Sequence, residues 1–112
     1  MSDDALTLDA LAGMHCTPGP QKLEPADIAR HVALLPGWED RGDHLEKTFR
    51  FPDYHATIAF VNALAWIAHR EDHHPDLGVH YNRCVVAFGT HSAGGITLND
   101  CISAARVERL TA

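Results

Sequence analysis

The sequence predicts an α+β domain in which a four-stranded antiparallel sheet carries three helices packed on one face. Two observations predict this class. Segments with helical spacing of apolar residues and segments with strand-like alternation follow one another in the order α-β-β-α-β-β-α. The strand segments also come in pairs joined by short polar turns, whereas a parallel sheet would need a longer crossover between successive strands. The chain contains no internal repeat.

The first helix is expected over residues 24–35, where apolar residues recur at helical spacing. Pro25 is tolerated in the first turn because the missing N–H would have no partner within the helix there. Asp27 is favourable near the positive end of the helix dipole. Pro36-Gly37 is expected to end the helix.

Residues 38–41 and 44–51 are expected to form the first hairpin, with Gly42-Asp43 as its turn. Every second residue of the longer strand, starting from Leu45, is apolar except Lys47. This alternation predicts a strand with one buried face, on which Lys47 is the polar exception.

The longest helix is expected over residues 54–72, with Asp53 as its N-cap. So many of its residues are apolar that the helix is predicted to lie across the sheet as the spine of the core. The expected core stripe is Ile58, Val61, Ala65 and Ala68, widened by Phe60, Leu64 and Ile67.

A second hairpin is expected from residues 78–81 and 84–90, with its second strand the more buried of the two. The last helix is expected to begin after Thr97, a candidate N-cap. Asp100 stands three residues later, at the capping-box position.

Length and composition predict one soluble domain of 112 residues, with residues 1–21 as an arm that is either partly ordered or flexible and residues 22–112 as the folded part. The net charge of −6 argues against a nucleic-acid partner. No run approaches the ~20 apolar residues of a membrane span, and the acidic start lacks the basic region of a secretory signal. Three widely spaced cysteines without a C-x-x-C pair predict a cytoplasmic location.

Histidines gather where the longest predicted helix ends. Of the nine in the chain, His69, His73 and His74 lie close together, and His91 follows the second hairpin. Pro75 is expected to halt the helix and turn the chain, so that adjacent imidazoles can point into one pocket. Since free imidazole titrates near pH 6.5, such a cluster can donate and accept protons at neutral pH.

A zinc site is the alternative interpretation of this cluster, because His69 and His73 lie four residues apart on one helical face. In the H-E-x-x-H pattern a glutamate follows the first histidine, whereas Arg70 does so here. No cysteine lies nearby to complete a structural site, and the sequence is interpreted as having no metal site.

Several motifs together resemble the pterin-4a-carbinolamine dehydratases. They are residues 71–76 (EDHHPD), 81–83 (YNR) and 90–97 (THSAGGIT), followed by Asp100, in this order and spacing. Upstream, residues 35–38 (LPGW), 48–51 (TFRF) and 60–62 (FVN) are similar to other parts of the same family. The resemblance covers about residues 22–111 and implies the family's α+β fold.

The resemblance implies dehydration of 4a-hydroxytetrahydropterin to quinonoid dihydropterin, supporting tetrahydrobiopterin recycling. This reaction needs an acid at the leaving 4a-oxygen and a base at ring N5, roles that suit imidazole. By the resemblance, His73 and His91 are the candidate acid/base pair, and His74 completes the catalytic trio by binding and orienting the pterin. Asp100 is expected to orient an imidazole or bind the ring, with helix capping as the alternative. No metal, nicotinamide or flavin cofactor is implied.

Two departures from the family accompany the resemblance. Leu77 stands where the animal enzymes have tryptophan, and His69 stands where an acidic residue is common, and both positions are assigned to the substrate-binding site. A homodimer or homotetramer is also implied. The alternative functions are a non-catalytic dimerisation or interaction module, and a role in another pterin pathway such as molybdopterin synthesis. The remaining histidines are interpreted as ordinary surface or half-buried residues: His15, His31, His44, His55 and His80.

Overall fold

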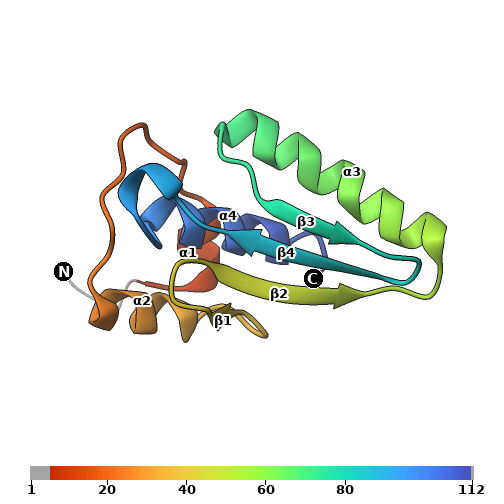
Figure 1. Cartoon of the computed structure of the whole chain (residues 1–112), viewed down its shortest axis with the longest axis horizontal. Coiled ribbons are helices and arrows are strands. Elements are labelled where there is room, and N and C mark those ends of the chain that lie inside the picture. The colour runs from red at the N-terminus through yellow and green to blue at the C-terminus, as the bar shows by residue number, and fades with distance from the viewer. Residues whose placement is uncertain (1–5, 112) are drawn as a thin grey trace.

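Four strands form one antiparallel sheet in the order β1-β2-β4-β3, as seen in the computed structural model, which describes residues 6–111 (Figure 1). The strands are β1 (Glu39–Asp40), β2 (Leu45–Arg50), β3 (Asp76–Val79) and β4 (Arg83–Phe88). The α+β class and the four-stranded antiparallel sheet are confirmed. The two central strands, β2 and β4, are paired over their whole length.

The described residues form four α-helices, one more than the sequence predicts: α1 (Leu8–Ala12), α2 (Pro25–Val32), α3 (Tyr54–Glu71) and α4 (Leu98–Glu108). The additional helix α1 packs against α4 and buries Leu11 completely. A short 3-10 helix, η2 (His91–Ala93), follows β4. In Figure 1, α4 lies behind β4 and α2 lies beside β1. No helix among residues 6–111 is long and apolar enough to cross a membrane.

One face of the sheet is buried and supplies the core. On β4, buried residues alternate with half-buried ones, with Val86 and Phe88 on the inward side. Leu64 of α3 and Ile102 of α4 belong to the same cluster of buried side chains. Such burial stabilises the fold by about 1.5–3 kcal/mol for each large apolar side chain.

The predicted apolar face of α3 is right in part, because Phe60, Leu64 and Ala68 are buried. The centre of the predicted stripe is shifted, because Ala65 is exposed and Ile58 is only half-buried. The ring of Phe60 packs at a tilt against Phe49 and Phe51, with ring centroids 4.6 and 5.0 Å away. A helix with apolar residues on most sides can bury either face, and here the contacts with Phe49 on β2 and with Phe51 just after it select the face that packs inward. The buried residues of α3 are Thr57, Phe60, Leu64, Ala68 and Glu71.

Lys47, the polar exception on β2, closes a partly buried ion pair. Its Nζ donates to Glu108 Oε1 at 2.6 Å and to the carbonyl of Pro36 at 2.7 Å, and it lies 4.7 Å from the ring centroid of Phe49. Glu108 also accepts from Trp38 Nε1 at 2.9 Å. The lysine therefore links the end of α4 to the first hairpin while its aliphatic stem covers apolar surface.

The second hairpin begins two residues earlier than predicted. Asp76 pairs with Ala87, and the turn is closed by a hydrogen bond from His80 N to Arg83 O at 2.9 Å. Because paired residues share a face of the sheet, Asp76 and Ala87 lie on the face opposite the core residue Phe88.

The segment after α1 is fastened to α3 through the carboxylate of Glu71, whose side chain is only 5% exposed. The backbone N–H of Cys16 donates to Oε1 at 2.7 Å, His15 Nδ1 lies 3.0 Å from Oε2, and Arg106 lies 3.8 Å away. Burial alone would raise the pKa of Glu71, but these hydrogen bonds and the guanidinium charge outweigh burial and lower it. The N-terminal segment is thereby held beside the helix end that precedes the histidine pair.

Candidate active site

The end of α3 is set by Asp72, which adopts a left-handed conformation with φ 51° and ψ 42°. Aspartate tolerates this region better than most side chains, and its N–H bonds the carbonyls of Ala68 and His69. The chain leaves the helix at this point, so His73 and His74 follow directly in the connection to β3.

His73 is hydrogen-bonded to a fully buried carboxylate. Its Nε2 lies 2.5 Å from Asp100 Oδ1, and its ring is stacked against Phe88 with centroids 6.0 Å apart and planes 12° apart. The second oxygen, Oδ2, accepts from Thr97 N and from Thr90 Oγ1, each at 2.8 Å. Asp100 therefore caps α4 with one oxygen and orients His73 with the other, which combines two roles that the sequence left as alternatives.

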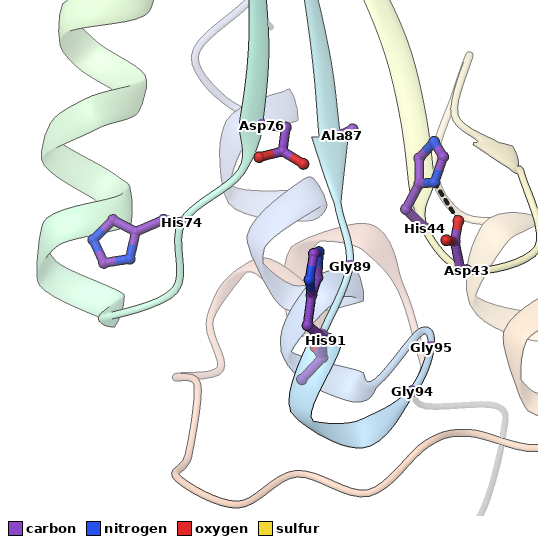
Figure 2. Close-up of a pocket in the computed structure, with 10 residues that line it drawn as sticks. Asp43, His44, His74, Asp76, Ala87, Gly89, His91, Gly94 and Gly95 are labelled. Atoms are coloured by element: carbon purple, nitrogen blue, oxygen red, sulfur yellow. Dashed lines mark hydrogen bonds and ion pairs between the residues drawn. The ribbon is translucent and has the colours of Figure 1, made fainter.

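A cavity of about 600 Å³ lies at the end of β4, and a volume of this size holds a small organic molecule (Figure 2). His74, from the connection after α3, and His91, from the start of η2, both contribute to its walls. Figure 2 shows His91 between His74 on one side and Asp43 with His44 on the other. The lining residues are Asp43, His44, His74, Asp76, Ala87, Gly89, Thr90, His91, Gly94 and Gly95.

The three histidines predicted to be catalytic do not all line the cavity. His74 and His91 line the cavity, whereas His73 is packed against Phe88 and bonded to Asp100. Thr90 connects the two groups, because it lines the cavity and its hydroxyl also donates to Asp100.

His69 and Leu77 do not line this cavity. His69 is exposed on α3, with its ring centroid 6.2 Å from that of Trp66. Leu77 is 37% exposed on β3 and follows Asp76, so their side chains point to opposite faces of the strand. Among residues 6–111, no three histidine, cysteine or acidic side chains are grouped so that they could hold a metal ion.

Two cavity residues, Asp43 and His44, were missed by the sequence reasoning. His44 Nδ1 lies 2.6 Å from Asp43 Oδ1, and its Nε2 lies 3.1 Å from Glu46 Oε1. The sequence marks Asp43 only as a turn residue, and no local pattern distinguishes His44 from a surface histidine. Their place in the cavity depends on the approach of this turn to Gly89, which is far away in the sequence.

A family model described as "Pterin 4 alpha carbinolamine dehydratase" matches residues 21–110 of the chain. The chain belongs to this family. The resemblance inferred from the motifs is thereby confirmed. A protein from Stenotrophomonas maltophilia K279a, assigned by name as a pterin-4-alpha-carbinolamine dehydratase, is 57% identical over 106 residues, covering 90% of this chain and 91% of its own. A protein of the same assignment from Chromobacterium violaceum is 56% identical over 102 residues, covering 89% and 94%.

Two solved structures share the fold. The crystal structure of a transcriptional coactivator/pterin dehydratase from Brucella melitensis matches with a TM-score of 0.78 and 28% identity, covering 82% of this chain and all of its own. A pterin dehydratase-like protein identified as a RuBisCO assembly factor in the alpha-carboxysome matches less closely, with a TM-score of 0.57 and 27% identity over 66% of this chain and 88% of its own.

Proposed function

We propose that this chain is a hydro-lyase that dehydrates 4a-hydroxytetrahydropterin to quinonoid dihydropterin and water, as part of tetrahydrobiopterin recycling. In this reaction the C4a–O bond breaks, the proton on N5 leaves, and a C4a=N5 double bond forms. The observation that carries the proposal is the cavity lined by two imidazoles, His74 and His91, next to the His73–Asp100 pair, in a chain of this family. The assistance that the protein must supply is proton transfer, to the leaving oxygen and from N5, for which imidazole is suited at neutral pH.

In this proposal His73 and His91 are the acid/base pair, and His74 binds and orients the pterin. His91 is exposed to the cavity and can reach a bound ring. The carboxylate of Asp100 fixes the orientation of His73 and leaves Nδ1 on the free edge of its ring. Since His73 does not line the cavity, this role requires the bound substrate to reach that edge, and otherwise His74 takes its place.

The test is the decay of chemically generated 4a-hydroxytetrahydropterin, followed by ultraviolet absorbance with and without the protein. Wild type is expected to accelerate the decay. His73→Ala and His91→Ala are each expected to lose about 10²–10⁴-fold of the acceleration, the usual contribution of a positioned acid or base. His80→Ala is the matched control, because His80 is exposed and lies outside the cavity. If His74→Ala loses the rate while His73→Ala keeps it, the two roles are exchanged.

The second candidate function is a non-catalytic interaction module. It is favoured by the structural similarity to a pterin dehydratase-like protein that was identified as a RuBisCO assembly factor. The same assay separates the two candidates, because a wild-type protein that leaves the decay rate unchanged supports only the interaction module. If the protein is active but pterin recycling is not its role, the enzyme would serve another pterin pathway, such as molybdopterin synthesis.

We also propose self-association into a homodimer or homotetramer. Within residues 6–111, β3 is an edge strand that pairs with β4 on one side only, and Leu77 and Val79 on it are 37% and 42% exposed. Exposed apolar residues on a free strand edge favour pairing with a second copy. Light scattering should therefore give a mass above that of one chain, and Val79→Lys should lower it.

The cytoplasm is the proposed compartment. The cysteines support this compartment, because Cys16, Cys84 and Cys101 are free thiols and none of them forms a disulfide, as is usual in the reducing cytoplasm. Burial raises the pKa of the Cys84 and Cys101 thiols, which disfavours the reactive thiolate.

A further inference from the structure

The turn between β1 and β2 forms the wall of the cavity across from His74 (Figure 2). It is pressed against Gly89: a Cβ at that position would lie 2.8 Å from the carbonyl oxygen of Asp43 and 3.1 Å from Cβ of His44. A side chain larger than hydrogen would therefore push the turn away. The absence of a side chain at residue 89 allows Asp43 and His44 to approach the strand end that leads to His91.

The carboxylate of Asp43 is held in place by a neighbouring ring. His44 Nδ1 lies 2.6 Å from Asp43 Oδ1, and its other nitrogen lies 3.1 Å from Glu46 Oε1. A ring that donates from both nitrogens is an imidazolium. The hydrogen bond between the two residues lowers the pKa of Asp43, and the same bond, assisted by Glu46, raises the pKa of His44. Each group thus stabilises the charged form of the other.

An ionised carboxylate is purely a hydrogen-bond acceptor, so it selects ligands that present N–H or O–H donors. The side chain of Asp43 is 81% exposed, which leaves it accessible to a ligand in the cavity. The pyrimidine ring of a pterin offers two adjacent donors on one edge, the 2-amino group and N3–H. A carboxylate can accept both through two parallel hydrogen bonds, the geometry it also uses with guanidinium.

We propose that Asp43 binds the 2-amino and N3–H edge of the substrate's pyrimidine ring, and that His44 is the positioning residue that orients this carboxylate. The inference rests on the proposed function, since it names the part of the pterin that this wall recognises. It is supported by the order of the side chains across the cavity, where His91 lies between Asp43 and His74. A ring anchored at Asp43 extends its fused centre, which contains C4a, toward His91.

The experiment compares the binding of two stable ligands, pterin and lumazine, to the purified full chain by fluorescence titration at pH 7. Lumazine carries a 2-oxo group in place of the 2-amino group, and so presents an acceptor to the carboxylate. Wild type is expected to prefer pterin by about 10–100-fold, which corresponds to the loss of one or two charge-assisted hydrogen bonds. Asp43→Asn should abolish the preference, because its amide can turn and donate to the 2-oxo group. His44→Ala should reduce the preference several-fold, since it frees the carboxylate to move.

Asp76→Asn is the matched control, because it makes the same chemical change on another wall of the same cavity. It should keep the wild-type preference. If Asp43→Asn keeps the preference, or if Asp76→Asn abolishes it, the inference is overturned. Wild type that binds neither ligand would overturn both this inference and the proposed function. An Asp43-dependent preference in a protein that does not accelerate dehydration would refute the proposed function alone.

Discussion

Substitution of Asp100 should lower both the free energy of unfolding and the rate of dehydration, and two different variants should separate the two effects. Asp100 is fully buried, and its oxygens serve His73, Thr90 and the backbone N–H of Thr97. In Asp100→Ala, the Thr97 N–H and the His73 ring lose their partners in a buried setting, which costs about 1–3 kcal/mol each. Thr90 keeps a hydroxyl partner, because its Oγ1 lies 2.9 Å from Thr97 Oγ1. The expected loss in the free energy of unfolding is therefore about 3–5 kcal/mol.

Asp100→Asn has nearly the same shape and keeps one acceptor oxygen for the Thr97 N–H. It should cost only about 1–2 kcal/mol. The amide nitrogen cannot accept a hydrogen bond from His73 Nε2–H, so the imidazole is expected to lose its tautomer and orientation. Dehydration should then fall by about 10²-fold or more, although most of the protein remains folded.

Urea denaturation measures the stabilities, and the absorbance assay measures the rates on protein shown to be folded. Thr97→Ala is the control, since it removes the N-cap hydroxyl but leaves the His73–Asp100 bond intact. It should cost about 1 kcal/mol and keep the dehydration rate. An Asp100→Asn variant with wild-type activity would refute the role assigned to this hydrogen bond.

Three further predictions concern other parts of the molecule. The pKa of Glu71 is lowered in the fold, so the carboxylate stabilises the protein above its unfolded pKa of about 4.3, and this stabilisation is lost as the pH falls through the folded pKa. The free energy of unfolding in urea should therefore differ between wild type and Glu71→Gln by about 1–2 kcal/mol near pH 7. This difference should shrink in acid, and a difference that stays constant with pH would contradict the prediction. Gly89→Ala places a Cβ 2.8 Å from the carbonyl oxygen of Asp43. It should lower the free energy of unfolding by about 1–3 kcal/mol and weaken the preference for pterin over lumazine. In the control Gly78→Ala the nearest contact of the new Cβ is 3.6 Å, and both quantities should stay at their wild-type values. Burial raises the pKa of Cys101 to about 12, so its thiol should resist a thiol reagent at pH 8 until the protein is unfolded, and rapid labelling of the native protein would show that the site is open.

The features predicted correctly from the sequence are those set by neighbouring residues. The Asp53 side chain caps α3 by accepting from Ala56 N at 2.9 Å, and the predicted capping box between Thr97 and Asp100 is present. The alternation of buried residues on β4 follows from its own sequence. In each case the physical cause acts over a few residues, where hydrogen-bond geometry and side-chain period are local properties.

The features that were missed depend on contacts between distant segments. The buried face of α3 is selected by contacts with Phe49 and Phe51, and the pattern of a nearly all-apolar helix cannot specify that face alone. The place of Asp43 and His44 in the cavity follows from the approach of their turn to Gly89. The burial of Leu11 likewise depends on α4, at the other end of the chain. The periodicity of apolar residues within one segment does not indicate which distant segment will pack against it.

The central claim is tested most directly by the first-order rate constant for decay of 4a-hydroxytetrahydropterin at pH 7, measured with wild type, His91→Ala and the control His80→Ala. Wild type and His80→Ala are predicted to accelerate the decay equally, and His91→Ala to lose about 10²–10⁴-fold of that acceleration. A wild-type protein that leaves the spontaneous rate unchanged, or a His91→Ala variant as fast as wild type, would contradict the account.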